Sequence, residues 1–246
     1  MNIRKRFKNK KENIKLWIEI ERRVSSSTDS YIQKILYETD NVNATVATAL
    51  SDINGNEYRD EDGKLVAPIT WQCSCLQKKC GACAMVVNGV PKLACDSFLR
   101  DYKKTIRLSP LHKFPVVRDL MVDRNILYSN LKTMNTWLEN SSNIEDRDQD
   151  IVFESSKCLL CGCCLEVCPN FEPDQSFYGA AVFVPITGIL SSTQKLDRGD
   201  IAQKYMKYIY EGCGKSLSCQ SICPANIDME NMLIHSNKIS IWKNKK

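Results

Sequence analysis

The chain has 246 residues, which is room for one large domain or two ordinary ones. Its 13 cysteines are odd in number and gather at 73–95, 158–168 and 213–223, a grouping that suits metal ligands and argues against a secreted disulfide scaffold. The formal charge of +5 comes from basic tails, because residues 12–237 hold 24 Lys/Arg against 29 Asp/Glu. This acidic core disfavours nucleic-acid binding.

The sequence predicts no targeting or membrane-spanning segment. The basic start MNIRKRFKNKK is followed by a charged, strand-like segment, where a signal peptide would continue into an apolar stretch. The longest uncharged stretch, residues 176–194, contains Pro185, and its apolar part is shorter than the roughly 20 residues that cross a bilayer. We therefore expect a soluble chain in a reducing compartment, with this stretch forming a core helix and a turn.

The first 60 residues predict two strands and a helix. Residues 14–23 and 30–39 are rich in β-branched and aromatic side chains with partial alternation, which is typical of paired strands, and a Ser-rich turn separates them. After Asn41 the apolar spacing becomes helical, and the helix is expected to end at Gly55. The expected apolar face of this helix consists of Val42, Val46, Ala49, Leu50 and Ile53. Strand, strand, helix and then a cysteine loop is the order expected of a small β-grasp ferredoxin.

The first cysteine group has the spacing of a plant-type 2Fe-2S site. Cys75, Cys80 and Cys83 follow C-x4-C-x2-C, and Cys95 comes after two short strands around an Asn-Gly turn that would return it to the loop. Lys78 and Lys79 place positive charge nearby and would raise the reduction potential, although they can equally be plain surface lysines. Cys73 lies outside the spacing and is expected to be a bystander.

The chain then closes the first domain and becomes helical. Residues 104–111 read as a closing strand, and residues 114–120 contain the junction between an N-terminal domain, 1–112, and a helical domain, 113–246. From Arg124 onward the apolar spacing predicts helices interrupted by cysteine turns. The two histidines, at 112 and 235, are expected to be surface or packed residues.

The second cysteine group, CLLCGCCLEVCP, has the cubane spacing C-x2-C-x2-C-x3-C-P at Cys158, Cys161, Cys164 and Cys168. Three thiolates on one tight turn can reach one cube, whereas a fourth that is carried about 6 Å along a helix cannot. Cys168 must therefore bind a different cluster, which predicts a second site downstream. Cys163 is off register and is expected to be a packed neighbour.

The third cysteine group supplies that second site. Cys213, Cys219, Cys223 and Pro224 repeat the template with Ser216 at its middle cysteine position. Crossing the fourth ligands pairs Cys223 with the first three cysteines of the second group as a 4Fe-4S site, and leaves Cys168, Cys213 and Cys219 for a 3Fe-4S cluster. A 4Fe-4S cluster completed by Ser216 is the alternative. Structural zinc would explain the C-x2-C pairs but not the paired C-P endings.

Other chemistry is not indicated by the sequence. Gly212 and Gly214 give a GxG without the rest of a dinucleotide fingerprint, and neither a phosphate loop nor a catalytic triad is evident. We therefore assign no catalytic residue and expect the chain alone to move single electrons.

The motifs together resemble the iron-sulfur subunit of succinate dehydrogenase and fumarate reductase. The resemblance covers nearly the whole chain through SCLQKKCGACAMVVNGVPKLAC, FPVVRDLMVD, CLLCGCCLEVCPNF and CGKSLSCQSICP. It implies an α+β chain with an N-terminal β-grasp 2Fe-2S domain and an all-α domain of bacterial-ferredoxin type. It also implies an FAD-containing flavoprotein partner, a membrane anchor with quinone, and a location on the cytoplasmic face of the cell membrane through those partners.

Two departures from the family pattern leave alternatives for the electron acceptor. Lys78 stands where many members have Gly in the first loop. Glu172-Pro173 stands where many members carry a tryptophan near the quinone. Gly214 stands where some members carry a histidine. The alternatives are a free-standing multi-cluster carrier and a subunit of a thiol-linked fumarate reductase.

Overall fold

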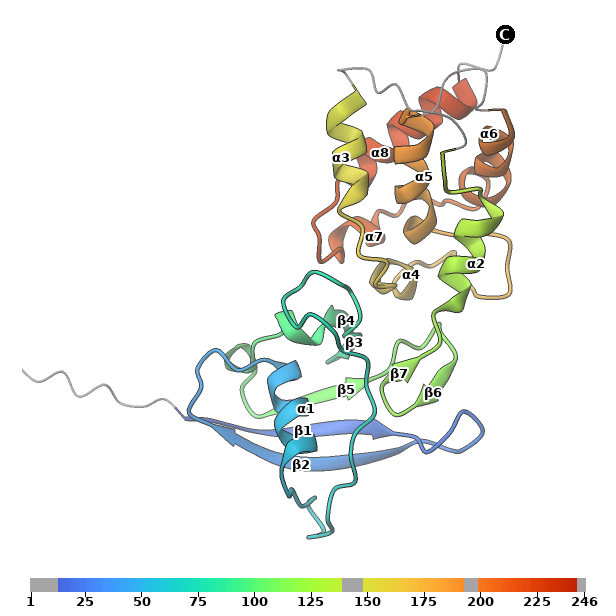
Figure 1. Ribbon diagram of the computed structural model, residues 1–246. Helices are drawn as coiled ribbons and strands as arrows, with labels where there is room; N and C mark the ends of the chain where they lie inside the picture. Colours follow the sequence, from blue (N-terminus) through green and yellow to red (C-terminus); the bar gives the residue numbers. More distant parts are fainter. Residues whose placement is uncertain (1–12, 139–147, 193–198, 243–246) are drawn as a thin grey trace, which may run out of the picture.

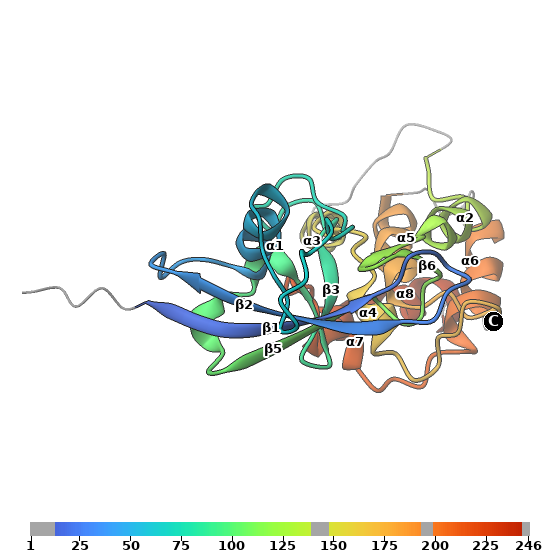
Figure 2. The same ribbon diagram turned by 90° about the horizontal axis from the view of Figure 1, so that it is seen from below.

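A sheet domain and a bundle of helices follow one another along the chain and meet at the cysteine loops (Figure 1). The structure, a computed structural model, describes residues 13–138, 148–192 and 199–242. This is the predicted α+β arrangement, and Figure 2 shows the two parts side by side from a second direction.

The first part is built on a five-stranded mixed sheet with the order β2-β1-β5-β3-β4. β1 pairs with β2 in antiparallel fashion and with β5 in parallel fashion, and β4 lies at an edge, where Pro91 needs no ladder partner for its nitrogen. The strands are β1 Ile14–Arg22, β2 Tyr31–Thr39, β3 Ala84–Val87, β4 Val90–Leu93 and β5 Thr105–Ser109. The strands predicted from the sequence are thus confirmed.

The helix α1, Val46–Gly55, lies across one face of this sheet. Thr45 caps it, since the Thr45 hydroxyl accepts a hydrogen bond from the Thr48 amide while the Thr48 hydroxyl accepts one from the Thr45 amide. The predicted apolar face is wrong at one residue, because Val42 precedes the cap and is 43% exposed. The capping box decides where the helix begins, and the hydrophobic spacing alone extends it one turn too far. Two 3₁₀ turns, Ala94–Asp96 and Leu99–Asp101, follow β4.

A small hairpin, β6 Val116–Arg118 and β7 Met121–Val122, joins the two parts. Its turn residue Asp119 is buried and forms an ion pair with Arg22 of β1, with 2.9 Å between Arg22 Nε and Asp119 Oδ1. The same carboxylate accepts hydrogen bonds from the backbone amides of Arg23 and Thr70. One buried charge therefore fastens the hairpin to the sheet domain. The division between residues 112 and 113 stays a prediction.

The second part packs its helices around α5, Ala180–Ser192, which is buried along nearly its whole length. α3 and α8 lie against α5, and hydrogen bonds between α5 and α8 join Thr187 to Ser236 and Ser191 to His235. The helices are α2 Asn125–Thr133, α3 Gln149–Ser156, α4 Cys163–Glu166, α5, α6 Gly199–Tyr205, α7 Ser218–Ser221 and α8 Met229–Asn237, with π-helical turns at Met206–Tyr210 and Lys238–Trp242. Within the described ranges no helix is long and apolar enough to cross a bilayer.

The buried pair predicts that the hairpin is a stability element. Asp119→Ala should leave the buried Arg22 charge without its carboxylate partner and lower the free energy of unfolding by roughly 3–5 kcal/mol. Glu38→Ala, which breaks the exposed pair with Lys15, is the control and should cost less than about 1 kcal/mol. Urea unfolding followed by circular dichroism compares the two variants. Equal midpoints for both would contradict the assignment.

Candidate iron-sulfur sites

The first cysteine group lies on the loop between α1 and β3. Its last member, Cys95, follows the β3–β4 hairpin. The hairpin turns at Asn88 and Gly89, both with positive φ, and this returns Cys95 to the loop. The Cys75 sulfur accepts hydrogen bonds from the amides of Gln77 and Lys79, each at 3.3 Å. These donors lower the pKa of the Cys75 thiol to about 7, so the backbone favours the thiolate that iron binds.

The same loop explains why a residue other than glycine is tolerated at position 78. Lys78 adopts φ +58°, a left-handed conformation in which its amide donates to the Cys95 sulfur at 3.2 Å. Lys78 therefore supplies an amide to the Cys95 sulfur at a position where the resemblance implies glycine. The Lys78 ammonium pairs with Asp96 at 2.6 Å. This carboxylate offsets the positive charge that was expected to raise the potential of the site.

The members of this group influence one another electrostatically. Burial, together with the neighbouring Cys95 and Cys80, raises the pKa of Cys83 to about 12. The Cys80 side chain interacts with that of Cys75. The structure thus brings together all four residues that the plant-type spacing selects.

The predicted 4Fe-4S site, called the second group from here on, is a cavity in the helical part. The four predicted ligands Cys158, Cys161, Cys164 and Cys223 all face it, and the remaining lining is apolar apart from backbone. Burial raises the pKa of Cys164, and charge on its neighbours Cys161 and Cys158 adds to the effect. Cys223 comes from the downstream run, so the predicted exchange of fourth ligands is compatible with the fold.

The predicted 3Fe-4S site, formed by Cys168, Cys213 and Cys219, lies next to the 4Fe-4S site and is called the third group from here on. Burial, together with the neighbouring Cys168 and Cys213, raises the pKa of Cys219 to about 11. Ser216 is exposed, and its hydroxyl lies 3.1 Å from that of Ser218. Among the causes that raise the pKa of Cys164 is charge on Cys219, which places the third group beside the second.

The first and second groups also meet, through two glycines. A Cβ on Gly81 would lie 2.5 Å from the Leu159 carbonyl oxygen and 2.9 Å from Cys161 Cβ, so only glycine permits this approach of the two loops. Gly162, with φ +87°, turns the second loop, and a Cβ there would lie 2.9 Å from Phe114. The three cysteine groups therefore follow one another in space in the order of the chain.

Four cysteines line one cavity in the helical part, an arrangement that fits a cluster. Nowhere in residues 13–138, 148–192 and 199–242 do three His, Cys, Asp or Glu side chains converge as one metal ion requires. Thiolates that share one zinc ion sit about 2.3 Å from it and hence close together, whereas a cluster spreads its ligands over several irons. The cavity lined by four cysteines arranges its ligands around one space, as a cluster with several irons requires.

Several predicted bystanders have ordinary surroundings. Cys163 is fully buried and interacts with the Cys161 side chain, as expected of a packed neighbour. Cys73 is exposed. His112 Nδ1 lies 3.0 Å from a carboxylate oxygen of Glu166, and His235 packs against α5.

Three polar residues near the cysteines were missed by sequence reasoning. Lys113 donates to the carbonyl oxygens of Cys168 and Phe171, both at 2.7 Å. Glu166 accepts the amides of residues 112 and 113. Arg124 donates to backbone carbonyls of the first loop. Their acceptors and donors are backbone groups, which have no signature in the sequence.

The left-handed backbone of Lys78 leads to a test of the first loop. Lys78→Gly should retain the first cluster, because glycine keeps the amide and adopts this φ freely. Lys78→Pro should lose it, because proline removes the amide and fixes φ near −65°. Visible circular dichroism and iron content report the cluster, with Lys78→Gly as the matched control. Full cluster content in Lys78→Pro would refute a role for this amide.

Comparisons with known proteins identify the family. Residues 17–129 match the family described as "2Fe-2S iron-sulfur cluster binding domain", and residues 154–227 match that described as "4Fe-4S dicluster domain". A chain of the Mycobacterium smegmatis Sdh1 complex in the apo form has the same fold, with a TM-score of 0.75, 18% identity, and coverage of 93% of this chain and 96% of that one.

Two relatives at higher identity are iron-sulfur subunits. The succinate dehydrogenase iron-sulfur subunit of Bacillus subtilis is 32% identical over 215 residues, covering 80% of this chain and 81% of the relative. The fumarate reductase iron-sulfur subunit of Escherichia coli O6:H1 is 30% identical over 173 residues, covering 67% and 71%. Together with the cysteine geometry, these matches show that the chain belongs to the family of electron-transfer iron-sulfur subunits of succinate dehydrogenase and fumarate reductase.

Proposed function

We propose that the chain holds three clusters in a row and passes electrons along them one at a time. The observation that supports this most strongly is the contact of each cysteine group with the next, first through Gly81 and Cys161 and then through α4 and α7, the helices that carry Cys164 and Cys219. The proposed ligands are Cys75, Cys80, Cys83 and Cys95 for 2Fe-2S, Cys158, Cys161, Cys164 and Cys223 for 4Fe-4S, and Cys168, Cys213 and Cys219 for 3Fe-4S.

Bound clusters would supply reversible one-electron chemistry, and the chain would supply the surroundings that control it. Backbone amides donate to the Cys75 and Cys95 sulfurs and would stabilise negative charge there. Burial of Cys83 and Cys164 would keep water from the sulfurs on the inner side of each site. This chemistry requires no proton-transferring side chain, in accordance with the absence of an assigned catalytic residue.

The likeness to named relatives supports partners on both sides of the row. We place an FAD-containing flavoprotein, where succinate and fumarate interconvert, on the side of the first cluster. A membrane anchor and its quinone belong on the side of the third. The chain itself would be cytoplasmic and would lie on the inner face of the cell membrane through these subunits.

The surroundings of the third group differ from those expected of the family. Glu172 pairs with Lys113 at 3.4 Å. A Cβ on Gly214 would lie 3.1 Å from Asn170 Oδ1, and Asn170 donates to the Gly212 carbonyl oxygen. Glu172-Pro173 therefore stands where the resemblance implies a tryptophan, and Gly214, which lies against Asn170, stands where it implies a histidine. The identity of the electron acceptor therefore needs a test separate from that of the flavoprotein partner.

The partner proposal predicts that the isolated chain neither oxidises succinate nor reduces fumarate. Tagged chain from its own host should purify with a flavoprotein, and succinate should then reduce its clusters within a rapid-mixing experiment. The flavin-free chain mixed with succinate is the control. Adding a quinone analogue to the complex tests the acceptor side.

Two results would contradict this proposal. Turnover of either acid by the flavin-free chain would place a substrate site on it. A chain that purifies alone, and whose clusters succinate does not reduce when the flavoprotein is present, would instead support a free-standing carrier. Reoxidation by a disulfide but not by a quinone would favour the thiol-linked alternative.

The third site predicts a change of cluster type in Ser216→Cys. A thiolate at this template position would provide a fourth ligand, so the oxidised three-iron EPR signal should disappear and the potential should fall, since negative charge is added beside the cluster. Ser221→Cys, which adds a thiol off the template on the same segment, is the control and should retain the signal. A wild-type chain with a full cube under oxidising conditions would refute the three-iron assignment.

A further inference from the structure

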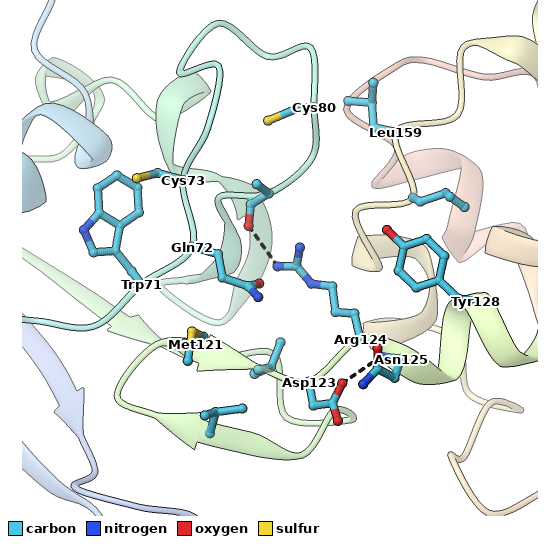
Figure 3. A pocket seen from close by; sticks show the side chains of 14 residues that line it. Trp71, Gln72, Cys73, Cys80, Met121, Asp123, Arg124, Asn125, Tyr128 and Leu159 are labelled. Atoms are coloured by element: carbon cyan, nitrogen blue, oxygen red, sulfur yellow. Dashed lines mark hydrogen bonds between the residues drawn. The ribbon is translucent and has the colours of Figure 1, made fainter.

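Arg124 lies between the first and second cysteine groups. It is the residue immediately before α2, and its side chain extends into a pocket between the sheet part and the helical part (Figure 3). This pocket is lined by Cys80 from the first group and by Leu159 and Leu160 from the loop of the second. The position of Arg124 follows from the β6–β7 hairpin, which directs the chain through this gap.

The Arg124 guanidinium holds the backbone around the first group. Its Nη1 donates to the Gly81 carbonyl oxygen at 3.3 Å, and its Nη2 donates to those of Ala82 and Ala84 at 3.1 Å each. These carbonyls flank Cys83 on both sides. A planar fork with several donors suits three carbonyls, whereas the single ammonium of lysine does not.

Arg124 is half-buried and has no carboxylate partner among its hydrogen bonds in the described chain. Burial lowers the pKa of Arg124, while the charges of Cys161, Cys163 and Cys83 oppose that effect. An arginine pKa starts so far above neutrality that the group stays charged. A fixed positive charge therefore lies between the loops of both groups, where partial burial makes its field stronger than it would be in bulk water.

We propose that Arg124 is a positioning residue whose fixed charge raises the reduction potentials of the first and second clusters together. This inference rests on the proposed function. A positive charge would stabilise the reduced form of a nearby cluster. Hydrogen bonds hold Arg124 against the first loop, and the pocket places it opposite Leu159 and Leu160 of the second. An electron passing between clusters held at these two sites would therefore stay close to the same charge. The third group lies beyond Cys164, so its potential should not change.

The direct test is an EPR-monitored redox titration of Arg124→Gln in the full chain. Loss of the charge should shift the one-electron equilibria of the first two clusters about tenfold toward the oxidised form, which is about 59 mV in potential, and leave the third cluster unchanged. Arg118→Gln removes an exposed arginine from the neighbouring hairpin and is the matched control. It should shift none of the three.

Arg124→Lys separates charge from geometry. The ammonium keeps the charge but loses the fork, so both potentials should stay close to those of the wild type while the midpoint of thermal unfolding falls. If Arg124→Lys lowers both potentials as much as Arg124→Gln does, with intact clusters, the role is geometric and the proposal is wrong.

Gln72→Glu provides a measurement that does not depend on the folding of the Arg124 variants. Gln72 Oε1 and Arg124 Nε are both buried without a hydrogen-bond partner, and in Figure 3 the Gln72 amide lies toward Arg124. A carboxylate of the same shape would offset the charge and leave the three carbonyl contacts in place. It should also lower the first two potentials and not the third.

The outcomes distinguish this inference from the function on which it rests. A wild-type chain without clusters would overturn the proposed function and this inference with it. Clusters present in wild type, with potentials that neither Arg124→Gln nor Gln72→Glu shifts, would overturn the inference alone. Equal shifts of all three clusters would show a general charge effect and would also count against it.

Discussion

The approach of the first cysteine loop to the second is the contact on which the rest of the structure depends. The buried apolar side chains of the two parts join into one continuous cluster, in which Leu111 and Phe114 of the connecting segment take part. Electron transfer between the proposed clusters would be faster over a short distance, and the close approach of the loops allows no side chain at Gly81, where a Cβ would lie 2.5 Å from the Leu159 carbonyl oxygen. The buried Arg22–Asp119 pair and the Arg124 hydrogen bonds hold the hairpin and the first loop in the positions that this contact requires.

The cysteine loops share a second constraint, which is a backbone that turns its amides toward sulfur. Left-handed residues other than glycine recur in all three loops, at Leu76, Lys78, Leu160, Lys215 and Leu217. Such residues are unfavourable by roughly 1–2 kcal/mol each, and they persist where surrounding structure determines them. In the first loop the benefit is visible, because the Lys78 amide points at Cys95. Strain near the sulfurs is thus balanced by the rigid sheet and helices on either side.

Much of this arrangement could be predicted from spacing, and the remainder depends on backbone groups. The strand alternation, the Asn88-Gly89 turn and the three cysteine groups are local patterns, and the structure contains them. The predicted start of α1 was wrong at Val42, since the Thr45 capping box overrides apolar spacing. Arg124 and Lys113 could not be assigned, because their partners are carbonyl oxygens, which every residue possesses. The ligand assignment itself stays a prediction.

The central claim is that one chain holds three different clusters in a row. Mössbauer spectroscopy of the chain produced with iron-57 and purified without oxygen tests it most directly, because two-, three- and four-iron clusters give separable spectra. The account predicts all three components, with about nine irons per chain in total, of which two belong to the first cluster, four to the second and three to the third. A spectrum with the two-iron component alone, or zinc bound by the cysteines of the helical part, would contradict it.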